Sequence, residues 1–104
     1  MLIQIRGFDN DCRIVISGEI DERGAEDLKM RFREIQSNRR RQVVVDLKDV
    51  THLGSAGIGR LLVLYKDLAV HGSSLHLVQV PKTIYRLLCE MKLNAIFSIS
   101  ELAA

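Results

Sequence analysis

Tryptophan is absent from this 104-residue sequence, and the other aromatic residues are two tyrosines and three phenylalanines. Few side chains are therefore available for stacking on bases, and the formal net charge is only +2. The only basic run, residues 39–41, lies between a helical pattern and an apolar strand pattern, a position typical of a solvated turn. We do not expect direct binding to nucleic acid.

Long apolar runs and paired cysteines are also missing. The longest apolar candidate is interrupted by Arg60, Lys66 and Asp67, so no stretch approaches the ~20 residues of a membrane-spanning helix. The two cysteines, Cys12 and Cys89, form no CxxC pair, and the first four residues run directly into a strand pattern instead of an apolar leader. These features predict a cytoplasmic protein that does not insert into membranes.

The composition is otherwise that of an ordinary folded domain, with 47% apolar and 27% charged residues and a single proline. A chain of this length buries roughly two-thirds of the surface that its unfolded form exposes. We therefore expect one domain that spans residues 1–104.

The first half of the sequence predicts a β-hairpin, a helix and a strand. Residues 3–6 and 13–17 are rich in β-branched residues, and residues 7–11 between them have turn chemistry. Asp21 is placed to cap a helix that runs to Gln36. Residues 42–47 (QVVVDL) form a continuous apolar run, which favours a central strand covered on both faces. The apolar face of the helix comprises Ala25, Leu28, Phe32 and Ile35.

The second half continues the alternation of helices and strands. A helix that starts at Ala56 ends near Gly72, residues 75–80 (LHLVQV) form a strand, and Pro81 opens a third helix before a short strand at residues 95–99. The predicted apolar faces comprise Ile58, Leu61, Leu62, Tyr65 and Leu68 on one helix, and Ile84, Leu87, Leu88 and Met91 on the other.

The order β-β-α-β-α-β-α-β predicts an α/β fold. Right-handed crossovers give a mixed, mostly parallel sheet with an antiparallel hairpin at its N-terminal edge and amphipathic helices beside it. The loop at residues 48–54 then opens at the carboxyl edge of the sheet, where α/β proteins place functional groups, with Ser55 at the start of a helix.

Four roles are open to Ser55 on the residues alone. It is a helix N-cap, a nucleophile, part of a phosphate-binding loop, or an acceptor of a phosphoryl group. The nucleophile elbow G-x-S-x-G fails at Leu53, and the predicted strand ends well before the serine. The glycine spacing matches no nucleotide-binding motif.

The three histidines are scattered along the sequence, and the interpretation for each is a solvated or structural residue. They are His52, His71 and His76. We therefore expect no enzymatic activity, no metal and no cofactor. A helix N-terminus tolerates the charge of a phosphoserine, so phosphorylation at Ser55 changes the surface and not the fold.

Residues 43–68, VVVDLKDVTHLGSAGIGRLLVLYKDL, resemble the signature of STAS domains, in particular of bacterial anti-sigma factor antagonists. That signature is an apolar strand ending in Asp-Leu, a short loop, and D-[ST]-[ST]-G-[LI]-G at the start of a helix. Residues 18–21 (GEID) resemble the family's G-x-[IL]-D, and residues 92–97 (KLNAIF) resemble its closing G-L-x-x-x-F. The resemblance covers nearly the whole chain.

The resemblance implies partner switching. An unphosphorylated antagonist binds an anti-sigma factor that is also a serine kinase, phosphorylation releases it, and a PP2C-type phosphatase restores it. Ser55 matches the family's phosphoacceptor, Asp46 matches the aspartate of the central strand, and Gly54 stands where the family usually has aspartate. The implied contact surface comprises Asp21, Thr51, His52, Gly54, Ser55, Ala56, Gly57, Ile58 and Gly59.

A second role remains open, because STAS domains also occur as cytoplasmic subunits of lipid-transport ABC transporter complexes. In that role the domain is a constitutive part of the assembly, and Ser55 is not a switch.

Overall fold

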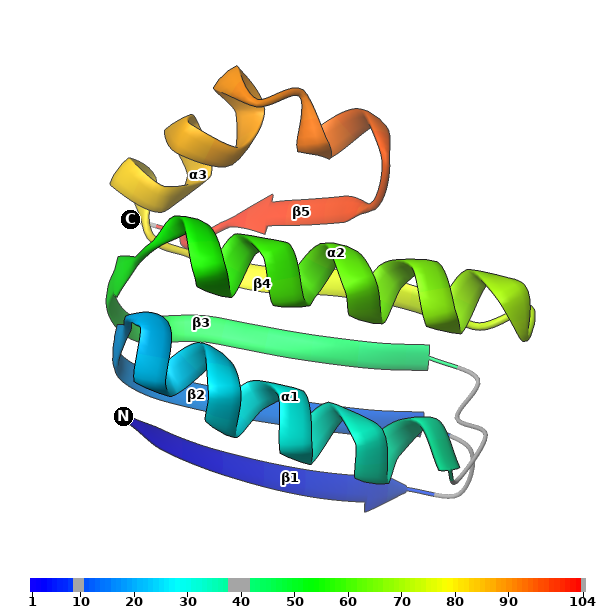
Figure 1. Ribbon diagram of the computed structural model, residues 1–104. Helices are drawn as coiled ribbons and strands as arrows, with labels where there is room; N and C mark the ends of the chain where they lie inside the picture. The colour runs from blue at the N-terminus through cyan, green and yellow to red at the C-terminus, as the bar shows by residue number, and fades with distance from the viewer. Residues whose placement is uncertain (9–10, 38–41, 104) are drawn as a thin grey trace.

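The computed structural model describes residues 1–8, 11–37 and 42–103 as strands and helices around one sheet (Figure 1). The basic run at residues 39–41 lies outside the described residues. The elements are β1 (Leu2–Phe8), β2 (Asp11–Ile20), α1 (Glu22–Ser37), β3 (Gln42–Leu53), α2 (Ser55–Val70), β4 (Ser74–Val80), α3 (Lys82–Glu90), the 3-10 turn η1 (Leu93–Ala95) and β5 (Ser98–Glu101).

The strand order in the sheet is β1-β2-β3-β4-β5. β1 pairs with β2 in antiparallel orientation, and each later pair is parallel. The predicted α/β fold, with its mostly parallel sheet and its N-terminal hairpin, is confirmed. The strands of the hairpin reach further than predicted, since Gly7, Phe8 and Asp11 belong to strands and not to the turn.

The helices lie over one face of the sheet. The parallel strands advance across the sheet in one direction, so right-handed crossovers place each connecting helix on the same side. Figure 1 shows α1 and α2 side by side over that face. In β3, Val43 and Val45 are fully buried beneath the helices, but Val44 between them is only half-buried. The prediction that this strand is central in the sheet is confirmed, but helices cover only one of its faces and not both as expected.

The face opposite the helices carries a buried carboxylate. Asp46 of β3 is 5% exposed. Its Oδ2 atom accepts hydrogen bonds from Arg13 Nη2 at 2.6 Å and from Gln79 Nε2 at 2.5 Å, and its Oδ1 atom accepts one from the Lys48 backbone N–H at 2.9 Å. Gln79 adopts a left-handed backbone conformation with a φ of 52°. This cluster ties three adjacent strands together.

The prediction of a loop at residues 48–54 is wrong, because β3 continues to Leu53. Two register shifts in the pairing of β2 with β3, between Val15 and Ser17 and between Gly18 and Glu19, accommodate the irregular segment. The pairing then continues as far as Ile20 opposite Leu53. Only Gly54 separates the end of this strand from α2.

The first two helices were predicted more accurately than α3 and the last strand. The four apolar residues of the predicted first helix are all buried. The second helix ends as predicted, with Gly72 in the left-handed conformation at a φ of 74°. α3 buries Ile84 and Leu88, whereas Leu87 and Met91 are 37% and 47% exposed. The last strand begins three residues later than predicted, because residues 93–95 form the turn η1.

Candidate functional site

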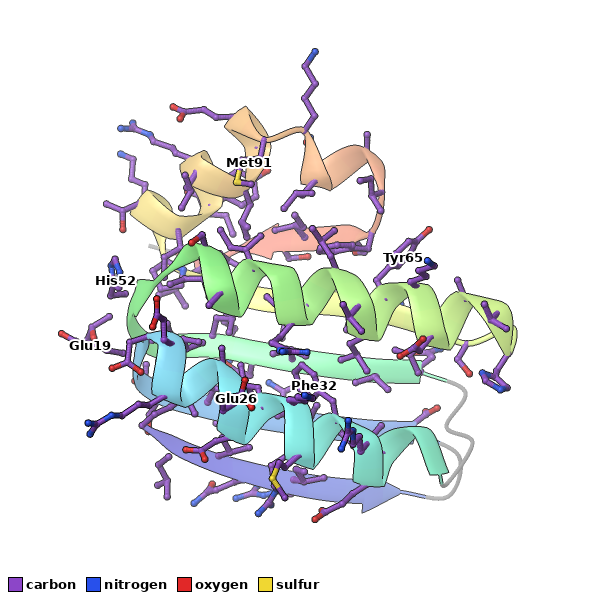
Figure 2. All side chains as sticks on the ribbon, in the orientation of Figure 1. Glu19, Glu26, Phe32, His52, Tyr65 and Met91 are labelled. Atoms are coloured by element: carbon purple, nitrogen blue, oxygen red, sulfur yellow. The ribbon has the colours of Figure 1, made fainter. Side chains whose placement is uncertain are left out.

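The N-terminal ends of α1 and α2 lie next to each other at the carboxyl edge of the sheet. The Gly54 backbone N–H donates a hydrogen bond of 3.0 Å to the Ile20 carbonyl oxygen, which joins the two strand-to-helix junctions. Glu19 lies opposite His52 in the same strand pair, at the edge where Figure 2 labels both residues. Two parallel helix dipoles therefore present their positive ends side by side, which favours negative charge at this edge.

Asp21 caps α1, as predicted. Its Oδ1 atom accepts a hydrogen bond of 2.8 Å from the Gly24 backbone N–H. This bond lowers the pKa of the exposed Asp21 carboxyl below its ordinary value of 3.8. A fixed carboxylate therefore stands beside the start of α2.

Ser55 is the first residue of α2 and is exposed. The N-cap of this helix is Gly54, with a φ of −82° and a ψ of 172°, so the hypothesis that Ser55 is the N-cap is wrong. Because glycine has no side chain, the cap contains no side-chain hydrogen bond. The Ser55 hydroxyl lies at the surface, where a macromolecule reaches it directly.

The turn before Ser55 is shorter than the sequence predicted. The strand ends at Leu53, two residues before the serine, and not well before it as the sequence predicted. Leu53 still occupies the first glycine position of the motif. His52 lies beside Gly54, with its Nε2 atom 3.8 Å from a Cβ position at residue 54, whereas the other two histidines lie elsewhere. His71 lies at the far end of α2 with its Nδ1 atom 2.9 Å from the Asp67 carbonyl oxygen, and the Nε2 atom of His76 contacts Ser74.

Within the described ranges, no group of His, Cys, Asp and Glu side chains is arranged to hold a metal ion. Nor does any described helix have both the length and the apolar character needed to cross a lipid bilayer. Cys12 is buried in β2 and Cys89 is half-buried in α3, and neither of these two described cysteines forms a disulfide.

The fold brings the predicted contact residues to one edge but at different depths. Asp21, Thr51, His52 and Ser55 are exposed, and Gly54, Ala56 and Gly59 are partly exposed. Gly57 and Ile58 are buried, so their side of α2 faces the sheet. These two residues support the surface from below instead of forming it.

Gly57 sets the distance between α2 and the sheet. A Cβ atom at this position would lie 2.6 Å from Ile20 Cγ2 and 2.8 Å from Leu53 Cδ1. Gly59, one half-turn later, has no neighbouring atom within 4 Å of a Cβ position. The two glycines therefore have different roles, one in packing and one at the surface.

Residues of α1 next to this edge were not among the predicted contact residues. A hollow of about 540 Å³ lies between the two helices beside Ser55, lined by Glu22, Ala25, Glu26, Ala56, Gly59, Arg60 and Val63. The α1 residues of the hollow lie within five positions of the capping Asp21, and right-handed crossovers place α1 beside α2, so the predicted topology already indicated that they lie near Ser55.

The protein has an α/β fold whose mixed sheet has one antiparallel edge, parallel strands beyond it and helices over one face. The STAS domain family model matches residues 3–102, and the chain belongs to this family.

Solved structures with the same fold have different biological settings. An anti-sigma factor antagonist from Mycobacterium paratuberculosis has a TM-score of 0.85 at 23% identity, over 95% of this chain and 84% of that chain. SpoIIAA, a Bacillus cell fate determinant solved in its phosphorylated form, has a TM-score of 0.78 at 14% identity, with coverage of 94% and 90%. A sulfate transporter family protein from Wolinella succinogenes has a TM-score of 0.74 at 16% identity, with coverage of 86% and 75%. At these identities the similarity establishes the fold.

Proposed function

We propose that this protein is an anti-sigma factor antagonist of a partner-switching pathway. In its unphosphorylated form it binds an anti-sigma factor that is also a serine kinase, and this binding frees a sigma factor for transcription. The protein itself is a cytoplasmic binding module without catalytic activity. The observation that carries the proposal is the position of Ser55, which is exposed at the first residue of α2 and is not the cap of that helix.

The switch is a phosphoryl transfer to Ser55. The kinase transfers the γ-phosphoryl group of ATP to the Ser55 Oγ atom, the hydroxyl proton passes to the kinase, and ADP leaves. A PP2C-type phosphatase returns the serine by hydrolysis of the phosphoester with water. The phosphate adds about −1.5 to −2 charges, which the positive ends of two neighbouring helices stabilise within the fold. The same charge is costly inside an interface, so the partner is released.

The contact surface in this proposal surrounds Ser55. Asp21, Thr51 and His52 stand exposed around the serine, and Gly54 and Ala56 flank it in the chain. Gly57 and Ile58 fix the height of α2 above the sheet. An aspartate at position 54 is compatible with the backbone, since a Cβ atom there would lie 3.4 Å from the Ile20 carbonyl oxygen. The glycine therefore lowers the negative charge beside the phosphoacceptor without being required by the turn.

Phosphopeptide mapping tests this proposal. Purified kinases of the anti-sigma class from the same genome are incubated individually with the protein and Mg²⁺-ATP, and the modified residue is located by mass spectrometry. We expect one kinase to add a single phosphoryl group at Ser55, and Ser55→Ala to remove it. Ser98→Ala, which changes an exposed serine on β5, is the matched control and should be labelled like the wild type. Labelling of another residue, or of none by any of these kinases, would refute the switch.

The alternative role, a constitutive subunit of a lipid-transport ABC complex, is distinguished by the same residue. In that role an ATPase subunit of the transporter binds the protein regardless of the charge at position 55. Equal binding of wild-type protein and Ser55→Asp to such a subunit would favour it over the antagonist.

A further inference from the structure

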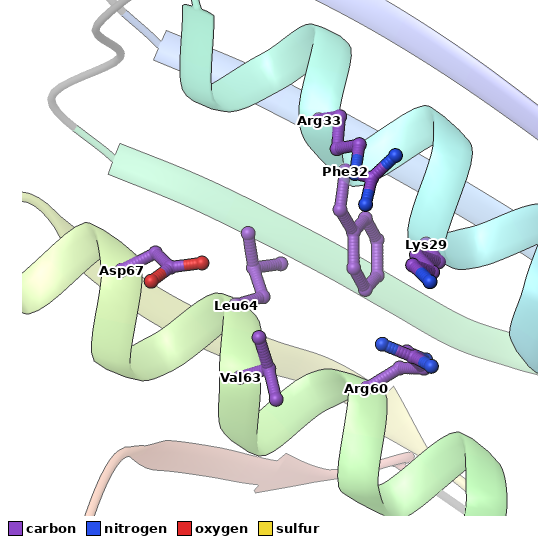
Figure 3. A pocket seen from close by; sticks show the side chains of 7 residues that line it. All are labelled: Lys29, Phe32, Arg33, Arg60, Val63, Leu64 and Asp67. Carbon is purple, nitrogen blue, oxygen red and sulfur yellow. The ribbon is translucent and has the colours of Figure 1, made fainter.

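A second hollow lies between α1 and α2, further from Ser55 than the first (Figure 3). It has a volume of about 180 Å³, and its floor is formed by the buried side chains of Phe32 and Leu64. Figure 3 shows Lys29 and Arg33 from α1 and Arg60 from α2 around the Phe32 ring. An apolar floor with cationic groups at its rim is suited to a ligand that combines an apolar and an acidic side chain.

The two hollows form one groove. Arg60 and Val63 line both of them, and Val63 is 49% exposed. Along α1 the lining residues run from Glu22 to Arg33, which at 1.5 Å per residue is a groove of roughly 16 Å. That length equals about three turns of an α-helix.

The charge changes sign along the groove. The end beside Ser55 carries Glu22 and Glu26, and the far end carries Lys29 and Arg33, with Asp67 as the acidic residue there. Arg60 Nη2 and Glu26 Oε1 meet across the middle at 3.7 Å. The side chains of this pair are 29% and 68% exposed, so the pair is weak and opens at little cost.

We infer that this groove receives an α-helix of the partner that covers Ser55. The helix places an apolar side chain beside Val63, acidic residues near Lys29 and Arg33, and a basic residue near Glu22 and Glu26. The inference rests on the proposed function, because the groove begins at Ala56 and Gly59, directly after the phosphoacceptor. A partner bound at Ser55 is therefore already in contact with the acidic end of the groove.

Shape and charge together favour a helix of defined direction. An amphipathic helix laid in a groove is anchored by side chains at intervals of three and four residues, and three turns supply two or three such anchors. The opposite charges at the two ends favour one orientation of that helix, since the reversed orientation would place like charges together. The groove thereby adds direction and specificity to a contact that Ser55 switches.

The test uses calorimetric titration of the kinase that labels Ser55. Val63→Asp places a charge in the middle of the groove, and we expect at least about tenfold weaker binding. Val70→Asp is its matched control, since it makes the same change at another exposed valine of α2, outside the groove. It should bind within about twofold of the wild type, the scatter expected of a surface change away from the interface. Melting curves of both variants confirm that they are folded.

A charge reversal tests the second element of the inference. Arg33→Glu should weaken binding by about three- to tenfold, with most of the change in the association rate, as for a charge at an interface rim. Arg86→Glu, an exposed arginine of α3 that does not line the groove, should have no such effect.

The outcomes separate the groove from the switch. If Val63→Asp and Arg33→Glu bind like the wild type while Ser55→Asp does not, the groove inference is wrong and the antagonist function stands. If none of the kinases binds even the wild-type protein, both fail. If the wild type is a dimer and Val63→Asp is a monomer, the groove belongs to a second copy of this chain, which also overturns the inference.

Discussion

Ile20 of β2 lies directly against Gly57 of α2, with its Cγ2 atom 2.6 Å from the position that a Cβ atom of residue 57 would occupy. This contact joins the two strand-to-helix junctions that carry the site. It sets how closely the start of α2, and with it Ser55, approaches the sheet.

A side chain at position 57 should therefore destabilise the protein. Gly57→Ala and Gly57→Val should lower the free energy of unfolding by about 1–3 kcal/mol, with valine the worse, because Ile20 and Leu53 must move. Gly59→Ala is the matched control: its Cβ atom meets no neighbour within 4 Å, so it should stabilise by about 0.5–1 kcal/mol through helix propensity. Urea unfolding measures all three. Equal stability of the two alanine variants would show that α2 does not rest on the sheet at Gly57.

The capping carboxylate of Asp21 should make stability depend on pH in the acid range. Its folded pKa lies below the ordinary 3.8, so its contribution is present above that value and is lost as the pH falls through the folded pKa. Asp21→Asn keeps an acceptor for the Gly24 N–H but has no charge to lose. Its melting temperature should therefore fall less steeply than that of the wild type between about pH 6 and pH 2. Parallel pH dependences for the two proteins would exclude this role for the carboxylate.

Gln79 combines an unfavourable backbone conformation with a hydrogen bond to Asp46. At a φ of 52° glycine is favoured over alanine by about 1–2 kcal/mol. Gln79→Ala loses the bond to the carboxylate and keeps the strain, so it should cost about 1.5–3 kcal/mol. Gln79→Gly loses the same bond but relieves the strain, and it should be the more stable variant. Thermal unfolding gives the order, and an alanine variant as stable as the glycine variant would contradict the strained conformation.

Residue periodicity predicted the helices and the sheet well because those elements bury one regular face. The spacing of Leu28 and Phe32 or of Leu61 and Leu68 follows from contact with the sheet, so it is visible in the sequence. The extension of β3 was not, because Lys48 and Asp49 interrupt the apolar run at the point where the pairing register shifts. Exposed Leu87 shows the opposite error, an apolar residue at helical spacing that the short α3 does not bury.

The sequence predicted which segments of the chain form the candidate site, but not which of their residues are buried. A motif identifies Ser55 and its neighbours, but whether a glycine supports a helix or lines a groove depends on the residue across from it. Gly57 faces Ile20, whereas Gly59 faces the open space beside α1. That difference arises from the packing of two helices that are separate in the sequence.

Calorimetric titration of the kinase with wild-type protein, Ser55→Asp and Ser55→Ala, beside melting curves, measures whether the charge at position 55 controls binding. Ser55→Asp should fold like the wild type, since a carboxylate suits the positive end of α2. An unpaired charge in the interface costs ~2–5 kcal/mol, so its affinity should fall by roughly 30-fold to more than a thousandfold. Ser55→Ala should bind like the wild type. Wild-type affinity of Ser55→Asp would show that Ser55 does not control binding of the partner and would rule out the switch.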